Sequence, residues 1–264
     1  MNIRRIGSAA AAVTLALGLA ACGSSDDGGE GQLKIGIKFD QPGLGLKEGN
    51  AYKGFDVDVA TYIAEKLGTP ADEIEWVQAP SAQRETLLET GQVDMIVATY
   101  SITDSRKEKV GFAGPYFIAG QDLLVRQDDD SITGPESLDG KRLCSVTGST
   151  SAQNVKKEVP GVNLQEFGTY SECVSALVSN AVDALTTDDT ILAGYASQDQ
   201  YQGKLKVVGA PVLQGQYIGN VALVYDWCHT LLTPEQRKRW TAYANNAVAN
   251  VWNHKGATWG QTRY

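Results

Sequence analysis

Short apolar runs that read as strands alternate with amphipathic helical segments, and this alternation limits the fold more than any other feature of the sequence. The first set covers residues 33–98 in the order strand, helix, strand, helix, strand. In its first helix, predicted over 54–68, the apolar residues at helical spacing are Val59, Ala60, Ile63, Ala64 and Leu67. Such alternation predicts parallel strands with helices on both faces, so the sequence indicates an α/β fold.

The same alternation returns between residues 141 and 198. The repeat predicts two similar lobes, each a mostly parallel sheet flanked by helices. We assign residues 32–120 together with 211–264 to the first lobe and residues 121–210 to the second. A cleft between two lobes is a preferred place for a small ligand.

The N-terminal residues resemble an export signal. Two arginines precede an apolar run over 9–21, which is shorter than the roughly 20 residues of a membrane span but typical of a signal peptide. The run ends in Leu-Ala-Ala-Cys, which resembles the lipobox of bacterial lipoproteins. An ordinary secretory signal with a chance cysteine is the alternative. We expect a signal peptide over 1–21, lipid on Cys22 and a flexible tether over 22–31, which together anchor an exported protein to the outer face of the cytoplasmic membrane.

The charge balance argues against nucleic acid as a partner. The chain has 23 Lys and Arg against 31 Asp and Glu, and loss of the two signal-peptide arginines takes its net charge from −8 to −10. Binding to phosphate backbones needs a basic face. Any anionic ligand is therefore expected to be bound by a local group of cations.

The cysteines suggest one disulfide. Export permits disulfides, and three cysteines remain if Cys22 carries lipid. Cys144 lies in a predicted strand and Cys173 in a predicted helix of the second lobe, and these two elements could be neighbours. We predict a disulfide between them, with two buried thiols as the alternative. Cys228 is left over.

A row of hydroxyl residues follows the predicted strand that ends at residue 98, and an arginine follows at once. The hydroxyl residues are Thr99, Ser101, Thr103 and Ser105. Ligands bind beyond the carboxyl ends of parallel strands, and a guanidinium makes two parallel charge-assisted bonds to a carboxylate. The segment therefore favours a receptor for a small anion built around Arg106, with an exposed helical Arg106 as the alternative.

These segments resemble a known family. Residues 54–67, GFDVDVATYIAEKL, resemble the signature of the polar amino-acid-binding proteins of ABC importers, the family 3 solute-binding proteins. Residues 98–117 resemble the ligand segment of that family, and a run of further motifs to about residue 210 is similar to actinobacterial glutamate-binding lipoproteins. The resemblance implies a type II periplasmic-binding-protein-like fold with the ligand in the interlobe cleft. It also implies a monomer that delivers an amino acid to an ABC permease.

The resemblance implies roles for particular residues. Arg106 is expected to clamp the ligand's α-carboxylate, and Asp188 its α-ammonium. Further contacts, through hydroxyl groups or backbone, are expected from Thr99, Ser101, Ser149 and Thr150. Asp188 has an alternative role as the N-cap of a helix, which Asp189 could fill instead.

Selectivity is expected to depend on two cations. Lys38 ends the first strand, where relatives that bind basic ligands carry an acid. Arg84 and Ser81 lie where a glutamate or aspartate binder contacts the distal carboxylate. A γ-carboxylate explains this local positive charge, so L-glutamate is the expected ligand, with aspartate or glutamine possible. Solvent exposure of Lys38 and Arg84 is the alternative.

The C-terminal part departs from the family pattern. Extended segments near 118–125 and 205–210 are expected to cross between the lobes. Beyond residue 211 the usual returning strand is not recognisable, which leaves open whether it completes the first lobe. A helix is still predicted over 233–256, beginning with a capping box at Thr233 and Gln236.

Two other classes of function compete with amino-acid binding: an enzyme and a sensor component. Dehydratases share the bilobal fold, but the chain has no Gly-x-Ser-x-Gly and no zinc-ligand spacing, and both histidines lie in the divergent C-terminal part. The acidic run 128–130 favours a solvated loop, because three consecutive acids cannot all face one ion. We therefore predict no catalytic residue, no metal and no cofactor. A sensor component is the third class.

Overall fold

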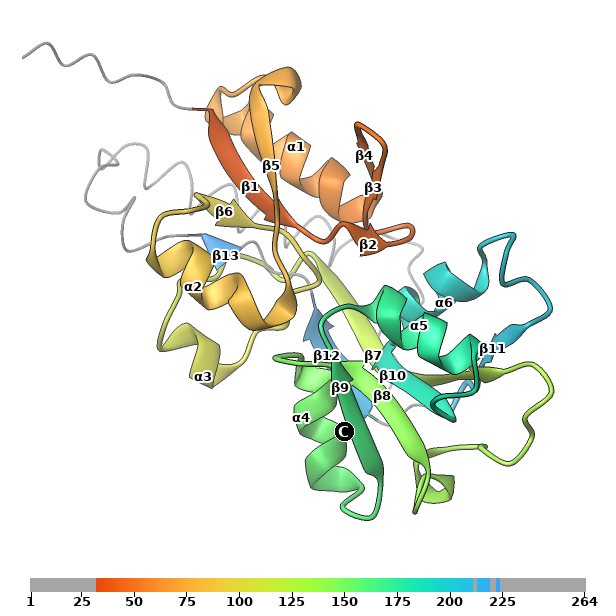
Figure 1. Cartoon of the computed structure of the whole chain (residues 1–264). Helices are drawn as coiled ribbons and strands as arrows, with labels where there is room; N and C mark the ends of the chain where they lie inside the picture. Colours follow the sequence, from red (N-terminus) through yellow and green to blue (C-terminus); the bar gives the residue numbers. More distant parts are fainter. Residues whose placement is uncertain (1–31, 211–212, 219–221, 224–264) are drawn as a thin grey trace, which may run out of the picture. The chain divides into compact units, whose positions relative to one another are not determined.

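The computed structural model describes residues 32–210, 213–218 and 222–223, which belong to one compact unit that begins at Gln32 (Figure 1). No helix within these ranges is long and apolar enough to cross a membrane. Several sequence expectations lie outside the described residues: the signal peptide, the tether, lipid on Cys22, the state of Cys228 and the helix over 233–256.

The first sheet has the strand order β13-β6-β1-β5. Its strands are β1 (Leu33–Ile37), β5 (Ile74–Gln78), β6 (Met95–Ile96) and β13 (Ala222–Leu223). β1 is parallel to both β5 and β6, as the alternation predicts. β13 is antiparallel to β6, with Ala222 opposite Ile96. A strand from the divergent C-terminal part therefore does pair with the first sheet.

Helices and a small antiparallel sheet surround the first sheet. They are α1 (Phe55–Leu67), α2 (Arg84–Glu89), α3 (Asp104–Lys107), the 3-10 turns η1 (Ala71–Glu73) and η2 (Ser81–Gln83), and the strands β2 (Asp40–Gln41), β3 (Gly45–Glu48) and β4 (Ala51–Lys53). α1 packs Val57, Ala60 and Ala64 against β1. Leu67, expected on this face, is 42% exposed. We call this part of the molecule the first lobe.

The second sheet has the strand order β11-β7-β10-β8-β9, and β12 also pairs with β7. Its strands are β7 (Phe117–Arg126), β8 (Arg142–Val146), β9 (Asn163–Phe167), β10 (Ala184–Asp188), β11 (Leu205–Val207) and β12 (Leu213–Ile218). β8, β9 and β10 are parallel as predicted. β7 is antiparallel to β10, β11 and β12, so this sheet is mixed rather than mostly parallel.

Three predicted helices cover the second sheet, and we call this part the second lobe. They are α4 (Thr150–Glu158), α5 (Tyr170–Val178) and α6 (Asp189–Ala196), with a 3-10 turn η3 (Pro135–Ser137). The hydroxyl of Ser149 accepts a hydrogen bond from the Ala152 amide at the start of α4. Thr169 and Glu172 form a capping box at the start of α5. These caps satisfy amide groups that a helix leaves unpaired at its N-terminus.

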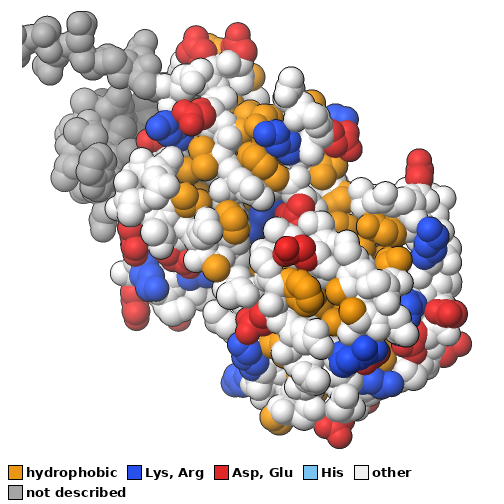
Figure 2. Space-filling view, in the orientation of Figure 1, with side chains coloured by type: hydrophobic (Ala, Val, Ile, Leu, Met, Phe, Trp, Pro, Cys, Tyr) orange, Lys and Arg blue, Asp and Glu red, His pale blue; other side chains and the backbone are white. Residues whose placement is uncertain are grey.

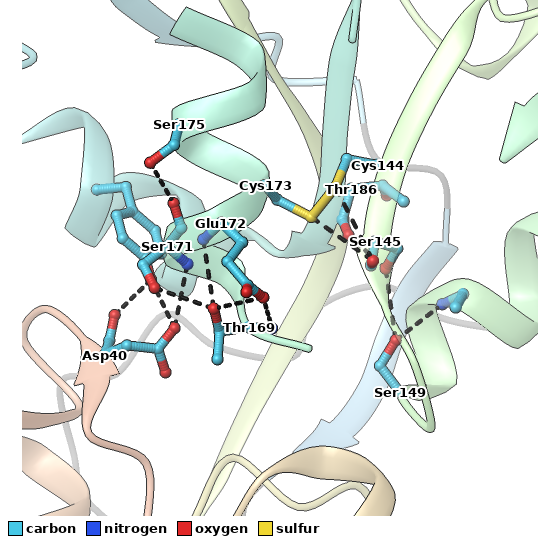
Figure 3. Close-up of a disulfide and its surroundings, with 12 residues drawn as sticks. Asp40, Cys144, Ser145, Ser149, Thr169, Ser171, Glu172, Cys173, Ser175 and Thr186 are labelled. Atoms are coloured by element: carbon cyan, nitrogen blue, oxygen red, sulfur yellow. Dashed lines mark hydrogen bonds between the residues drawn. A yellow bond between two sulfur atoms is a disulfide. The ribbon is translucent and has the colours of Figure 1, made fainter. Parts of the chain in front are cut away.

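The predicted disulfide is confirmed. Cys144 of β8 and Cys173 of α5 are bonded, with their Cα atoms 5.7 Å apart (Figure 3). Both residues are fully buried in the main apolar cluster of the second lobe. The bridge therefore fastens α5 to β8 of the second sheet.

The crossings between the lobes differ in part from the prediction. Leu205–Val207 forms β11 and pairs with the C-terminal end of β7, where Leu205 lies opposite Arg126. This segment therefore belongs to the second sheet. β12 is the strand of the second sheet that precedes β13 of the first sheet along the chain. In β12, Ile218 lies opposite Phe117, the N-terminal residue of β7. The sequence pattern did not show that β12, rather than β11, is the last strand of the second sheet before the chain returns to the first sheet.

Candidate functional site

A polar pocket of about 230 Å³, open space at its mouth included, lies between residues of the two lobes. Its lining consists of Ser81, Arg84, Thr99, Ser101, Ser149, Thr150, Ser151, Tyr170, Thr187, Asp188 and Ile191. These include all the predicted ligand-binding residues except Lys38 and Arg106. The structure therefore brings together side chains that are more than 100 positions apart in the sequence.

Arg106 is not among the residues that line this pocket, but it is 6% exposed, which excludes the surface alternative. Its guanidinium donates to the backbone carbonyls of Ser101 at 3.0 Å and Gly148 at 2.9 Å. Its Nε lies 3.3 Å from the Glu85 carboxylate. Arg106 thus joins the strand-end loop of the first lobe to the turn before α4 in the second lobe.

Arg84 is a second buried cation beside Arg106. It is 2% exposed and donates to the Ala98 carbonyl at 3.0 Å. Both guanidinium groups lie over the Tyr100 ring. The distance from Cζ to the ring centroid is 4.0 Å for Arg84 and 4.6 Å for Arg106. Burial, and next the charge of Arg106, lowers the pKa of Arg84 to about 10. The aromatic face offsets part of the cost of two neighbouring cations.

Lys38 adds a third cation. It is 5% exposed, and its Nζ donates to the Ser81 hydroxyl at 2.8 Å. Burial, followed by the charge of Arg84, lowers the pKa of Lys38 well below its ordinary value. Solvent exposure of Lys38 and Arg84 is therefore excluded. Buried cations are costly unless an anion compensates them, so this cluster favours an anionic ligand group.

The hydroxyl residues connect the lobes across the pocket. The hydroxyls of Ser101 and Thr150 are 3.0 Å apart. Ser149 also lines the pocket, but its hydroxyl serves as the cap of α4. The turn before it needs glycine, because Gly148 has φ +78° and a Cβ there would meet the Ala82 backbone at 2.7 Å.

Asp188, at the end of β10 in the second lobe, is the acidic residue among those that line the pocket. It occupies the N-cap position of α6 and is 4% exposed, yet among the described residues its side chain makes no capping hydrogen bond. Asp189 instead accepts from the Thr190 amide at 2.6 Å and the Gly120 amide at 3.2 Å. Burial, and next the charge of Asp189, raises the pKa of Asp188 to about 8. The sequence expectation that Asp188 serves the ligand pocket fits this arrangement better than its alternative role as the capping side chain of α6.

Two supporting residues were missed by the sequence analysis. Asp56 is 1% exposed and accepts from the Thr99 amide at 3.0 Å and the Tyr116 hydroxyl at 2.6 Å. It holds Thr99 at φ +45°, a strained conformation for a β-branched residue. Gln41 accepts from the Thr99 hydroxyl at 3.0 Å. From sequence, residue 56 was placed only within the helix predicted over 54–68.

Tyr170, the first residue of α5, was also missed by the sequence analysis. It lines the pocket and is 4% exposed. Burial and the nearby Asp188 raise the pKa of Tyr170 above its ordinary value, so its hydroxyl stays protonated. A neutral hydroxyl at this position can donate or accept a hydrogen bond.

Comparison with known proteins shows the family of this chain. Residues 33–255 match the bacterial extracellular solute-binding proteins, family 3. The chain belongs to this family. Over 218 residues it is 53% identical to the glutamate-binding protein GluB of Corynebacterium glutamicum. The matched segment covers 77% of this chain and 73% of GluB.

Solved structures of binding proteins resemble this family member throughout the described fold. An ancestral arginine-binding protein bound to glutamine is 32% identical, with a TM-score of 0.70 and coverage of 85% of this chain and 93% of that one. An ancestral amino-acid-binding protein, AncCDT-1, described as a precursor of cyclohexadienyl dehydratase, is 27% identical, with a TM-score of 0.69 and coverage of 85% and 91%.

The chemistry of the site agrees with a binding role. Its cations, hydroxyls and one acid can hold a small zwitterion with an additional negative group. Within the described residues, no group of three His, Cys, Asp or Glu could hold a metal ion. On the face shown in Figure 2, acidic and basic side chains are interspersed.

Proposed function

We propose that this family member captures L-glutamate outside the cell and delivers it to an ABC permease. The observation that carries the proposal is the burial of Lys38 and Arg84 beside the pocket that also contains Asp188. The identity to GluB supports the same ligand. Aspartate and glutamine are the nearest competitors, since they share the α-amino-acid groups.

The proposal divides the site into two parts. Arg106 and Asp188 hold the α-carboxylate and α-ammonium, which all amino-acid ligands share. Lys38 and Arg84 hold the γ-carboxylate, and Ser81 fixes Lys38 through the 2.8 Å hydrogen bond. A neutral γ-amide would leave a desolvated cation without an anionic partner, so the site should favour glutamate over glutamine.

Arg84→Ala is expected to reduce the preference for L-glutamate over L-glutamine by roughly 10- to 100-fold, because one hydrogen-bonded charge is lost from the γ-carboxylate. Calorimetry of the mature protein with both ligands measures the preference. Lys66→Ala, which removes an exposed cation from α1, is the matched control. Equal affinity of the unmodified protein for glutamine and glutamate would contradict the assignment of the side-chain part.

Binding should strengthen as pH rises from about 6.5 to 8. The ligand ammonium favours ionised Asp188, but the pKa of about 8 leaves this carboxyl mostly protonated in the empty pocket at lower pH. Binding must then release a proton, so affinity should increase about tenfold over this range and level off above it. Calorimetry in buffers of different ionisation enthalpy measures the released proton.

Asp188→Asn is the control for this pH dependence. It should bind more weakly and show a flatter pH profile, because the titrating group is gone. A profile with the same slope in the variant would assign the released proton to another acid, such as Asp56, whose pKa burial raises to about 6.

We also propose that the protein is exported and held at the outer face of the cytoplasmic membrane by lipid on Cys22. The family description as extracellular supports export. The Leu-Ala-Ala-Cys sequence and the polar residues 22–31 support a lipid-anchored protein on a flexible tether. In this arrangement a monomer would present its bound ligand to the permease.

A further inference from the structure

We propose that Asp40 is a latch that holds the two lobes together and slows ligand release without contacting the ligand. The inference rests on the proposed function, since it concerns how long the captured amino acid stays bound. It assigns this role to a contact between β2 of the first lobe and α5 and α6 of the second.

Asp40 makes a compact set of contacts with the second lobe (Figure 3). Its carboxylate accepts from the Ser171 amide at 3.1 Å and from the Tyr195 hydroxyl at 3.1 Å. The same hydroxyl also donates to the Asp40 backbone carbonyl. Ser171 is in the first turn of α5, where amide groups lack partners within the helix and favour a negative charge.

The second lobe is shaped to let β2 approach. Gly194 of α6 lies against Pro42, and a Cβ at Gly194 would meet the Pro42 carbonyl oxygen at 2.2 Å. No flexible side chain could relieve that clash, because the contact is with backbone. Tyr195, the next residue, is 3% exposed and held in the core of the second lobe. The donor to Asp40 is therefore rigidly placed.

The latch is separate from the ligand pocket. Among the described residues that line that pocket, Asp40, Ser171 and Tyr195 do not appear. Asp40 lines a neighbouring pocket of about 240 Å³ together with Lys38, Thr169 and Tyr170. Opening the lobes must break the Asp40 contacts whichever amino acid is bound, so the latch should act on the rate of release more than on selectivity.

Stopped-flow dissociation of L-glutamate from the mature protein tests the proposal. Asp40→Ala should raise the dissociation rate about 10- to 100-fold, because charge-assisted hydrogen bonds to the second lobe are lost. The association rate should change by less than about threefold, because most differences in affinity between related complexes lie in the dissociation rate. Asp58→Ala, which removes an exposed acid of α1, should leave both rates unchanged.

Tyr195→Phe separates the latch from an indirect effect. The charge of Asp40 also raises the pKa of Lys38, so Asp40→Ala alone could act through that cation. Tyr195→Phe keeps this charge and removes one hydroxyl, and should still raise the dissociation rate several-fold. An unchanged rate in Tyr195→Phe, or equal effects of Asp40→Ala and Asp58→Ala, would overturn the proposal.

Hydrogen exchange distinguishes failure of the latch from failure of the proposed ligand. The Ser171 amide should be protected in the unmodified protein and exchange faster in Asp40→Ala, with or without L-glutamate. If L-glutamate does not bind but this difference persists, the ligand assignment fails and the latch stands. If the Ser171 amide exchanges equally in both proteins under both conditions, the latch is rejected.

Discussion

Arg106→Ala is expected to abolish measurable binding of glutamate, aspartate and glutamine alike. In the proposed role, Arg106 holds the α-carboxylate that all three share, and its side chain is buried. Loss of one member of a buried charge pair commonly costs roughly 2 to 5 kcal/mol, or about 30-fold to several thousand-fold in affinity. The substitution would also remove the bonds to the Ser101 and Gly148 carbonyls.

Calorimetry with all three amino acids measures this loss, and thermal unfolding shows whether the variant remains folded. Arg106→Lys is an informative second variant, because it keeps the charge but cannot make the two parallel bonds of a guanidinium. Lys107→Ala, at an exposed position of the same short helix, is the matched control. An intact isotherm for any of the three ligands in Arg106→Ala would refute the assignment.

Removal of the Cys144–Cys173 disulfide should lower the free energy of unfolding by about 3 to 4 kcal/mol. The bridge spans a sequence separation of 29 residues, and in the chain-entropy model it stabilises the native state mainly by restricting the unfolded chain. Urea unfolding of the double variant Cys144→Ala/Cys173→Ala, compared with the unmodified protein, measures the difference.

A reducing agent supplies the control for the disulfide. It should destabilise the unmodified protein by a similar amount and leave the double variant unchanged. Mass spectrometry of the non-reduced mature protein should also find one peptide pair that joins Cys144 to Cys173. Free thiols at both positions would show that the bridge does not form.

Most of the fold could be predicted because each element has its own local pattern. The helices α4, α5 and α6 and the parallel strands β8, β9 and β10 all lie within residues 141–198, where the sequence predicted a second set of alternating strands and helices. Exceptions arise where tertiary contacts decide. Leu67 continues the helical spacing of α1 but lies at its exposed end, and the antiparallel pairing of β7 depends on strands far along the chain.

The candidate site was predicted by residue type more than by contact. Sequence could not decide whether Arg106 is buried or whether Asp188 caps α6, because both depend on tertiary contacts. Asp56 was missed since its partner Thr99 is 43 positions away. Asp40 was missed for the same reason, because its contacts with Ser171 and Tyr195 span 131 and 155 positions.

The pairing of β7 with β12 has a mechanical consequence. The chain's outward and returning strands are hydrogen-bonded side by side, with Phe117 opposite Ile218 and Ile118 opposite Tyr217. A movement of the lobes at this connection would have to bend both strands together, because sliding or twisting one strand would break its bonds to the other. We therefore expect the lobes to rotate about a single axis, so that every captured ligand is enclosed by the same movement.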